Sequence, residues 1–359
     1  MAKARRHRSG LYEARVQRDG RRYSVYGRTE REALAKLAEL ERKLAIDQPP
    51  PPGKLTVQEL CERWLETERK RWKPRTLHDY QRLLERFVYP AIGSVRLAKL
   101  TPDRLQRLFD AIPGRAASQT YRVLHACFQT AIRWRYIAEN PCDRVVPPAY
   151  QPPPVELPDA DALAKLFWHC LESDDDYAPL IGLTLLTGLR LGEVRSLRWS
   201  DIDLETGRIN VSRSTQKVGS QWVTTEPKTK AGRRVVFVGE LGIRLLKRQK
   251  AVVARRKLQA GTRWQENGLV FPGTAGQPLS ADRVNAAVRR LCKAAGVPRL
   301  TFHQLRHGSA SLSLLAGVAL PDLSRRLGHS DVSVTTRIYA HAIGDGKRVA
   351  EAIERVLGG

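Results

Sequence analysis

The stretch "PPAYQPPPVELP", residues 147–158, divides the chain into parts of different character. Proline has no backbone N–H and a fixed φ, so a run this dense cannot continue a helix and forms a stiff, extended linker. A second run of the same kind, "QPPPPGK", lies upstream at residues 48–54. The sequence therefore predicts three domains, at residues 1–53, 54–150 and 151–359.

The first domain is predicted to be a small sheet with one helix. Two alternating runs flank Asp19-Gly20 in "LYEARVQRDGRRYSVYG", which is a hairpin pattern. The next stretch, "TEREALAKLAELERKLA", has helical spacing, and Thr29 and Glu32 are placed as in a capping box. The first 28 residues hold 9 Lys/Arg and 2 acids, which suits a sheet laid on phosphates. A basic face that is merely solvated is the alternative.

The middle domain is predicted to contain four helices with basic faces. Each candidate begins with a Ser/Thr cap and carries apolar residues at helical spacing. The four are "TVQELCERWLETER" (56–69), "TLHDYQRLLERFVYPAI" (76–92), "TPDRLQRLFDAI" (101–112) and "SQTYRVLHACFQTAIRWRYI" (118–137). Pro90 fits the end of the second helix, and Asn140-Pro141 stops the fourth.

The third domain is predicted to be mixed. Helical patterns at 159–172, 177–187 and 191–197 lead into three strand-like runs, "RINVSRS", "QWVTTEP" and "RRVVFV", and helices resume from about residue 240. These runs predict one small antiparallel sheet. The fold class of the whole chain is therefore mainly α with small β-sheets, an α+β architecture.

The charge balance points to a polyanionic partner. The chain has 62 Lys+Arg against 37 Asp+Glu, a net charge of +25, and the three domains carry +6, +8 and +11. Nucleic acid is the usual partner for such an excess. A membrane surface is the competing interpretation, but no amphipathic membrane helix or lipidation site is visible, and "APLIGLTLLTGL" is too short to span a bilayer.

The cysteines and the first residues indicate the compartment. The five cysteines are far apart without a CxxC pair, which argues against a zinc ribbon or a disulfide framework and for a reducing cytosol. The opening "MAKARRHRSG" lacks the apolar segment of a secretory signal. We expect a soluble, cytoplasmic protein, associated with the nucleoid of a bacterium or of the host cell of a phage.

Four stretches of the third domain hold polar residues that a core pattern does not explain. Arg190 follows a glycine-containing helix break in "LLTGLRLGEV", and Lys228 lies near the tip of a turn between two strands in "EPKTKAGRRV". A surface ion pair and a solvated hairpin turn are the plainer interpretations. His303, Arg306 and His307 of "TFHQLRHGSA" share one helical face. Zinc binding there is disfavoured, because the Glu of HExxH is missing and Arg306 would repel a cation.

The fourth stretch is "LGHSDVSVTTRIYAH", residues 327–341. Gly328 allows a close backbone approach beside His329, and Ser333 or Asp331 can begin the helix that carries Tyr339. Taken by itself, Tyr339 is more readily explained as a core aromatic than as a nucleophile.

Together these residues suit attack on a phosphodiester. Two guanidinium groups can hold the non-bridging oxygens and stay charged while negative charge builds there. A tyrosine can attack phosphorus if a histidine accepts its proton, and a lysine can protonate the departing sugar oxygen. No metal or cofactor is required by this chemistry.

The ordered set resembles the active site of the tyrosine recombinase (phage integrase) family. The boxes that carry the resemblance are "TGLRLGEVRSLRWSDID", "PKTKAGRR", "HQLRHGSAS" and "LGHSDVSVTTRIYAH". The six matching positions are Arg190, Lys228, His303, Arg306, His329 and Tyr339. Gln304 is a departure, since many members carry an acid there. The middle domain resembles the helical, SAM-like core-binding domain of the family, and the first domain resembles its arm-binding domain.

The resemblance implies a role for each position. Arg190 and Arg306 would hold the scissile phosphate, and His329 would hydrogen-bond it. Lys228 would be the general acid toward the leaving 5′ oxygen, His303 would assist proton transfer, and Tyr339 would form a 3′-phosphotyrosyl bond.

The implied activity is cutting and rejoining of duplex DNA at attachment sites, integrating or excising a prophage or another mobile element. The implied assembly is a homotetramer on two paired sites, with a DNA-bending protein and an excisionase as optional partners. The alternatives are a Xer-like resolvase of chromosome or plasmid dimers, a type IB topoisomerase, and a non-catalytic DNA-binding regulator with this fold.

Overall fold

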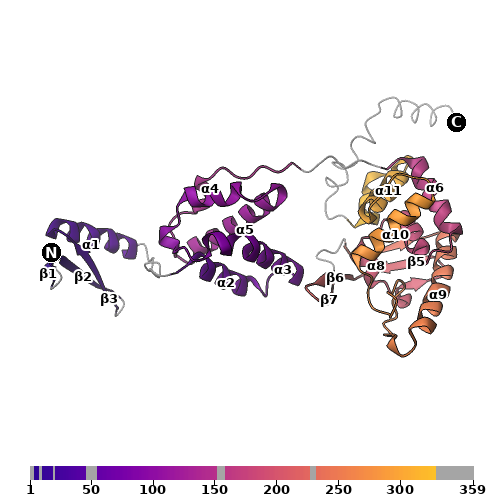
Figure 1. Ribbon diagram of the computed structural model, residues 1–359, viewed down its shortest axis with the longest axis horizontal. Helices are drawn as coiled ribbons and strands as arrows, with labels where there is room; N and C mark the ends of the chain where they lie inside the picture. The colour runs from indigo at the N-terminus through magenta and orange to yellow at the C-terminus, as the bar shows by residue number, and fades with distance from the viewer. Residues whose placement is uncertain are drawn as a thin grey trace, which may run out of the picture. The chain divides into compact units, whose positions relative to one another are not determined.

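The structure is a computed structural model that describes residues 4–7, 10–18, 21–45, 55–151, 158–226 and 232–328. The chain divides into two compact units, Met1–Pro152 and Pro153–Gly359. The described residues are mainly helical with small antiparallel sheets (Figure 1), so the predicted α+β fold class is confirmed.

The first unit begins with a three-stranded sheet and one helix. The elements are β1 (Arg5–Arg6), β2 (Tyr12–Arg18), β3 (Arg21–Gly27) and α1 (Glu30–Ala45), and the antiparallel strands lie in the order β1-β2-β3. The helix packs on one face of the sheet around Ala14, Ala33 and Leu37. A Cβ at Gly27 would lie 2.4 Å from the backbone nitrogen of Ala33, so only glycine permits this approach.

The start of α1 differs slightly from the expected capping box. The Glu32 N–H donates to the Thr29 hydroxyl at 3.2 Å as expected. The Glu32 carboxylate, however, accepts from the N–H of Arg28 at 2.8 Å rather than from Thr29. The short strand β1 was not predicted, because two residues are too few for a recognisable alternation.

The rest of the first unit is a helical bundle with its own core around Trp64, Leu84 and Phe128. Its elements are α2 (Val57–Glu68), α3 (Pro74–Leu83), the π-helix η1 (Leu84–Gly93), the 3₁₀ turn η2 (Leu97–Lys99), α4 (Pro102–Asp110), α5 (Gly114–Arg133) and the 3₁₀ turn η3 (Pro141–Arg144). Thr56 and Thr101 cap α2 and α4 as predicted.

Four predicted boundaries in this bundle are wrong. Helix α3 begins at Pro74 rather than at Thr76, since proline suits the first helical position. Helical turns run past Pro90, because η1 is a π-helix whose wider turns accommodate the proline ring. Helix α5 begins at Gly114 and ends at Arg133, before Arg135 takes a positive φ of 61°.

The described residues of the second unit form seven helices and two small sheets. The helices are α6 (Ala160–Glu172), α7 (Ala178–Thr187), α8 (Leu191–Ser196), α9 (Glu240–Ala260), α10 (Ala281–Ala294), α11 (Phe302–Leu315) and α12 (Leu320–Leu327). Short 3₁₀ turns lie at η4 (Trp199–Asp201) and η6 (Gly261–Arg263). Helix α7 is buried along almost its whole length and packs against α6, α9 and α11. An apolar helix of this kind belongs in the centre of a core.

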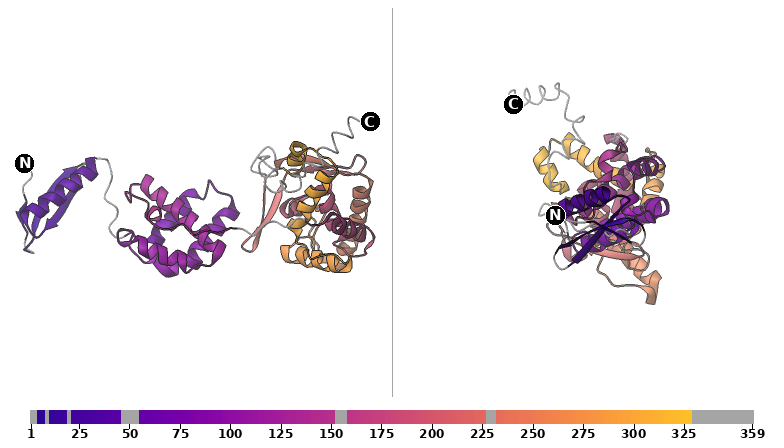
Figure 2. Two further views of the ribbon diagram at one scale, coloured as in Figure 1. Left: turned by 90° about the horizontal axis from the view of Figure 1, so that it is seen from above. Right: turned by 90° about the vertical axis from the view of Figure 1, so that its left-hand side faces the viewer.

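The described strands of this unit form two sheets, where the sequence predicts one. The strands are β4 (Ile202–Asp203), β5 (Arg208–Val211), β6 (Ser214–Val218), β7 (Gln221–Thr225) and β8 (Arg234–Phe237). One sheet has the order β4-β5-β8, and β6-β7 is a separate hairpin at the margin of the unit (Figure 2).

The chain changes sheets at Arg213. Its carbonyl accepts a bond from the Ser196 hydroxyl at 2.7 Å, and its guanidinium binds Asp201. Strands β7 and β8 belong to different sheets. Among the described helices, none combines the length and the apolar character that crossing a membrane requires.

Candidate active site

Arg190 lies at the sharp junction between α7 and α8. Gly188 ends α7 with a φ of 65°, and a Cβ there would lie 2.7 Å from Leu327. The positive φ, together with this close approach to α12, favours glycine at residue 188. The Arg190 N–H donates to the Glu193 carboxylate at 2.8 Å, and its guanidinium donates to the same carboxylate at 3.0 Å. The Arg190 side chain is still 40% exposed, so it can meet a ligand from solvent.

Arg306 of α11 joins the ends of two other helices. Arg306 as a whole is only 3% exposed. Its guanidinium donates to the carbonyls of Gly188 at 2.6 Å and Leu327 at 2.7 Å. Those carbonyls belong to the C-terminal ends of α7 and α12, where negative helix-dipole charge favours a cation. Arg306 therefore fixes the relative positions of α7, α11 and α12 beside Arg190.

His303 lies one helical turn before Arg306 and is exposed. Its pKa is lowered by partial desolvation, by Arg306 and by Arg190, so the imidazole is neutral near pH 7. His307 is buried against it, with the two rings in edge-to-face contact at 4.5 Å between centroids. Burial, His303 and Arg306 lower the pKa of His307 to about 4.

Gln304 has a structural explanation. Its side-chain oxygen accepts the N–H of Thr301 at 2.9 Å, while its own N–H donates to the Thr301 hydroxyl at 3.3 Å. This reciprocal capping box begins α11. The residue that departs from the family pattern therefore holds the start of the helix that carries His303 and Arg306.

One pocket of about 300 Å³ brings Arg190, His303 and Arg306 together. The other residues that line it are Leu189, Leu191, Asn285, Thr301 and Phe302. The other three predicted site residues, Lys228, His329 and Tyr339, lie outside the described residues, as does the helix start at Asp331 or Ser333. Gly328, which precedes His329, accepts a bond from Arg190 at 3.2 Å.

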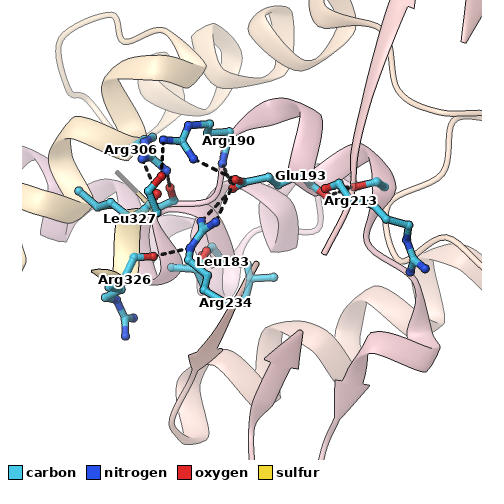
Figure 3. A network of polar contacts seen from close by, with 12 residues as sticks. Leu183, Arg190, Glu193, Arg213, Arg234, Arg306, Arg326 and Leu327 are labelled. Carbon is cyan, nitrogen blue, oxygen red and sulfur yellow. Dashed lines mark hydrogen bonds and ion pairs between the residues drawn. The ribbon is translucent and has the colours of Figure 1, made fainter. Parts of the chain in front are cut away.

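A buried carboxylate and two further arginines surround the pocket arginines (Figure 3). Glu193 binds Arg190 on one side and both terminal nitrogens of Arg234 on the other, at 3.0 and 2.9 Å. Arg234 also donates to the Arg326 carbonyl at 2.6 Å, and Arg326 donates to the Leu186 carbonyl at 2.7 Å. Glu193 is the acid that offsets part of this positive charge. The pocket is therefore suited to an anion.

The family models decide the identity of the chain. The model described as "Phage integrase family" matches residues 159–344, and the model described as "Phage integrase, N-terminal SAM-like domain" matches residues 56–111. The chain belongs to the phage integrase family. It is a tyrosine site-specific recombinase.

Curated relatives align with most of the recombinase. A "Tyrosine recombinase XerC-like" protein of Caldanaerobacter subterraneus subsp. tengcongensis is 29% identical over 361 residues, covering 93% of this chain and 90% of the relative. An "Integrase" of Streptomyces ambofaciens is also 29% identical, over 336 residues, covering 88% of this chain and 84% of the relative.

Solved structures share the fold. The Tn1549 transposon integrase in complex with transposon right end DNA has a TM-score of 0.66 at 23% identity, covering 85% of the recombinase and 100% of that chain. A lambda integrase dimer bound to a COC′ core site has a TM-score of 0.57 at 20% identity, covering 93% of each chain.

Sequence reasoning did not identify Glu193 and Arg234 as part of this site of the recombinase. Glu193 stands three residues after Arg190 at the start of a helix, which is a capping spacing that could have been noticed. Arg234 is a cation inside the strand-like run "RRVVFV", where burial demands a partner. Their pairing spans 41 residues, so it is visible only in the structure.

Proposed function

We propose that the recombinase integrates or excises a mobile genetic element by cutting and rejoining duplex DNA at attachment sites. The observation that carries the proposal is the shared pocket of Arg190, His303 and Arg306. Two guanidinium groups there suit a phosphate with two non-bridging oxygens, and they remain charged at every working pH.

The proposed cleavage step uses the six residues in named roles. The Tyr339 oxygen attacks phosphorus, and its proton passes to neutral His303. The P–O bond to the 5′ oxygen breaks as Lys228 protonates that oxygen, which leaves a 3′-phosphotyrosyl bond. Arg190 and Arg306 bind the charge that builds on the non-bridging oxygens, and His329 donates a hydrogen bond to them. Attack by the new 5′ hydroxyl reverses the same steps and rejoins the strand.

The lowered pKa of His303 supports its role as proton acceptor. A protonated imidazole cannot take a proton from tyrosine, and partial desolvation together with Arg306 and Arg190 keeps this ring neutral. Arg190 uses two of its five N–H donors for Glu193 and Gly328 among the described residues. Its exposed part can therefore reach a phosphate.

We also propose that the first unit binds DNA in two places. Residues 1–53 would bind arm-type sites, supported by exposed arginines on the strands at Arg5, Arg6, Arg15 and Arg22. Residues 54–150 would bind the core site, and residues 151–359 would carry the chemistry. A cavity of about 700 Å³ beside α3, η1 and α5 supports the core contact; its arginines are Arg82, Arg86, Arg115 and Arg122.

Recombination requires cuts on both strands of two duplexes, so we propose a tetramer on two paired sites. A lambda integrase tetramer bound to a Holliday junction shares the fold with a TM-score of 0.56, which supports this proposal. A DNA-bending protein and an excisionase would act as accessory partners.

The test compares the full chain with residues 54–359 on a minimal core site and on a full attachment site. The N-terminal sheet and helix have a core of their own, so their removal should leave the chemistry intact. We expect the truncated protein to cleave the core site normally and to lose integration at the full site. Each phosphate contact that is lost should also reduce the slope of log affinity against log salt concentration, by about 0.9. Equal integration by both proteins would overturn the arm-binding assignment and favour a resolvase.

A further inference from the structure

Arg234 of β8 is an enclosed arginine of the network around the pocket and does not line the pocket itself. Its side chain is 6% exposed and its carboxylate partner Glu193 is 7% exposed. Both terminal nitrogens bind the two oxygens of Glu193 at 3.0 and 2.9 Å, which is the paired geometry that arginine forms best with a carboxylate. The third contact runs from the Arg234 Nε to the carbonyl of Arg326, at 2.6 Å.

Glu193 is shared between two arginines of unlike exposure (Figure 3). Arg190 approaches it from the solvent side with a 40% exposed side chain, and Arg234 approaches it from the protein interior. One carboxylate cannot neutralise two guanidinium groups. Because Arg234 occupies both carboxylate oxygens, Arg190 keeps positive charge for an anion in the pocket.

Arg234 also takes part in holding the end of α12. The carbonyls of Arg326, Leu327 and Gly328 are consecutive, and they accept bonds from Arg234, Arg306 and Arg190, respectively. These are the orphan carbonyls that a helix end leaves without intrahelical partners. Residue 329 follows directly in the sequence.

We propose that Arg234 is a positioning residue for DNA cleavage. By binding Glu193 from the protein interior, Arg234 directs Arg190 toward the scissile phosphate and leaves Arg190 its positive charge. This inference rests on the proposed role of Arg190 as a phosphate ligand. Arg234 itself does not contact the substrate in this account, and it acts through Glu193 and through the end of α12.

The inference predicts a distinctive pH response. Burial raises the pKa of Glu193, but the bonds from Arg234, together with Arg190, outweigh burial and hold the pKa below its ordinary value. Without Arg234 the pKa of Glu193 must rise, and Arg190 becomes its sole strong partner. Above that pKa Glu193 would hold Arg190 as a neutralised pair, and below it the protonated acid would release Arg190.

Other charged groups around the pair do not produce the same response. Arg306 of α11 and Arg326 of α12 stay charged over the working range. His303 and His307 of α11 are present in wild type and variants alike, so their contribution cancels in the ratio of variant to wild-type rates.

The experiment measures single-turnover cleavage of core-site DNA by the full chain from pH 5.5 to 8.5, together with DNA affinity and thermal unfolding. The variants are Arg234→Met, Arg234→Lys and the double variant Glu193→Gln/Arg234→Met. Arg256→Met is the matched control, because Arg256 is also buried and binds a carboxylate and a carbonyl, Asp176 and Pro272.

We expect Arg234→Met to cleave about 10²-fold more slowly at pH 8, the loss typical of removing one stabilising donor. The ratio to wild type should recover as the pH falls. Arg234→Lys should retain part of the rate, and the double variant, which has no carboxylate to neutralise Arg190, should give a ratio independent of pH. DNA affinity should stay close to wild type in all of them.

Two results would overturn the inference. One is a folded Arg234→Met variant that cleaves at the wild-type rate. The other is a slow variant whose ratio does not change with pH and whose loss equals that of Arg256→Met, since this would reflect stability alone. If Arg234→Met does not fold, two other variants make the same comparison. They are Arg234→Lys and the double variant, which leaves no unpaired carboxylate.

Arg190→Ala is included to separate the two proposals. Normal cleavage by that variant would refute the phosphate-ligand role of Arg190, independently of Arg234.

Discussion

Replacing Arg306 with lysine tests whether the site needs the shape of a guanidinium or only its charge. Arg306 spans two carbonyls on different helices, Gly188 at 2.6 Å and Leu327 at 2.7 Å, from two different nitrogens. A lysine has one nitrogen on a flexible stem and cannot reproduce this fork. One buried carbonyl is left unpaired, which should lower the free energy of unfolding by about 1–3 kcal/mol. The lost donor toward the phosphate should slow cleavage by about 10²–10³-fold, or roughly 2.7–4 kcal/mol of activation free energy.

The assay for Arg306→Lys is single-turnover cleavage of core-site DNA on a denaturing gel, with DNA affinity and unfolding measured in parallel. DNA affinity should change little, since the net charge is unchanged. Arg256→Lys serves as the control, because Arg256 is 4% exposed in the same unit and donates to the Pro272 carbonyl. It should lose stability and keep its cleavage rate. If the two variants lose cleavage equally, Arg306 is a structural residue and its proposed contact with the phosphate is wrong.

Three further predictions concern the chemistry and the pH response. Cleavage should continue in excess EDTA, because Arg190 and Arg306 supply the positive charge that a metal would otherwise provide; loss of cleavage that magnesium restores would contradict this. Lys228→Ala should slow cleavage by about 10²–10⁴-fold, and a substrate with sulfur as the leaving atom should recover most of the rate, whereas no recovery would point to Lys230 or to a structural role. Because the pKa of His307 is lowered to about 4 in the fold, the unfolded chain binds its proton first as the pH falls, and about 2 kcal/mol of stability should be lost between pH 8 and pH 5. His307→Asn should flatten that pH dependence in denaturant unfolding, and an unchanged slope would mean that another group is responsible.

Local rules were sufficient for most of the helices. Thr56 and Thr101 begin helices in the structure as their sequence patterns predict, because a cap and its helix are only a few residues apart. Pro90 shows where a local rule fails: a proline normally ends a helix, but a change to π-helical turns lets the chain continue. That change cannot be read from spacing.

The sheets required long-range information. The run at residues 208–214 reads as one strand, yet it is divided between two sheets at a point where Ser196 and Asp201 bind Arg213. Neither partner is part of the run, so periodicity alone could not place the division.

The site was only partly predictable for the same reason. Arg190, His303 and Arg306 stand in recognisable motifs, and the structure brings these three into one pocket. The pairing of Glu193 with Arg234 and the contact of Arg234 with Arg326 span 41 and 92 residues. Charge complementarity at such separations cannot be assigned from sequence, because many other arginines could fill either position.

The central claim is that Tyr339 forms the covalent bond to DNA. The most direct measurement is to react the recombinase with core-site DNA, digest the adduct with protease and nuclease, and find the nucleotide-bearing residue by mass spectrometry. We predict a 3′-linked nucleotide on Tyr339 and no adduct from Tyr339→Phe, which should still bind DNA because it loses one oxygen and no charge. A nucleotide on any other residue, or an adduct formed by Tyr339→Phe, would contradict the account.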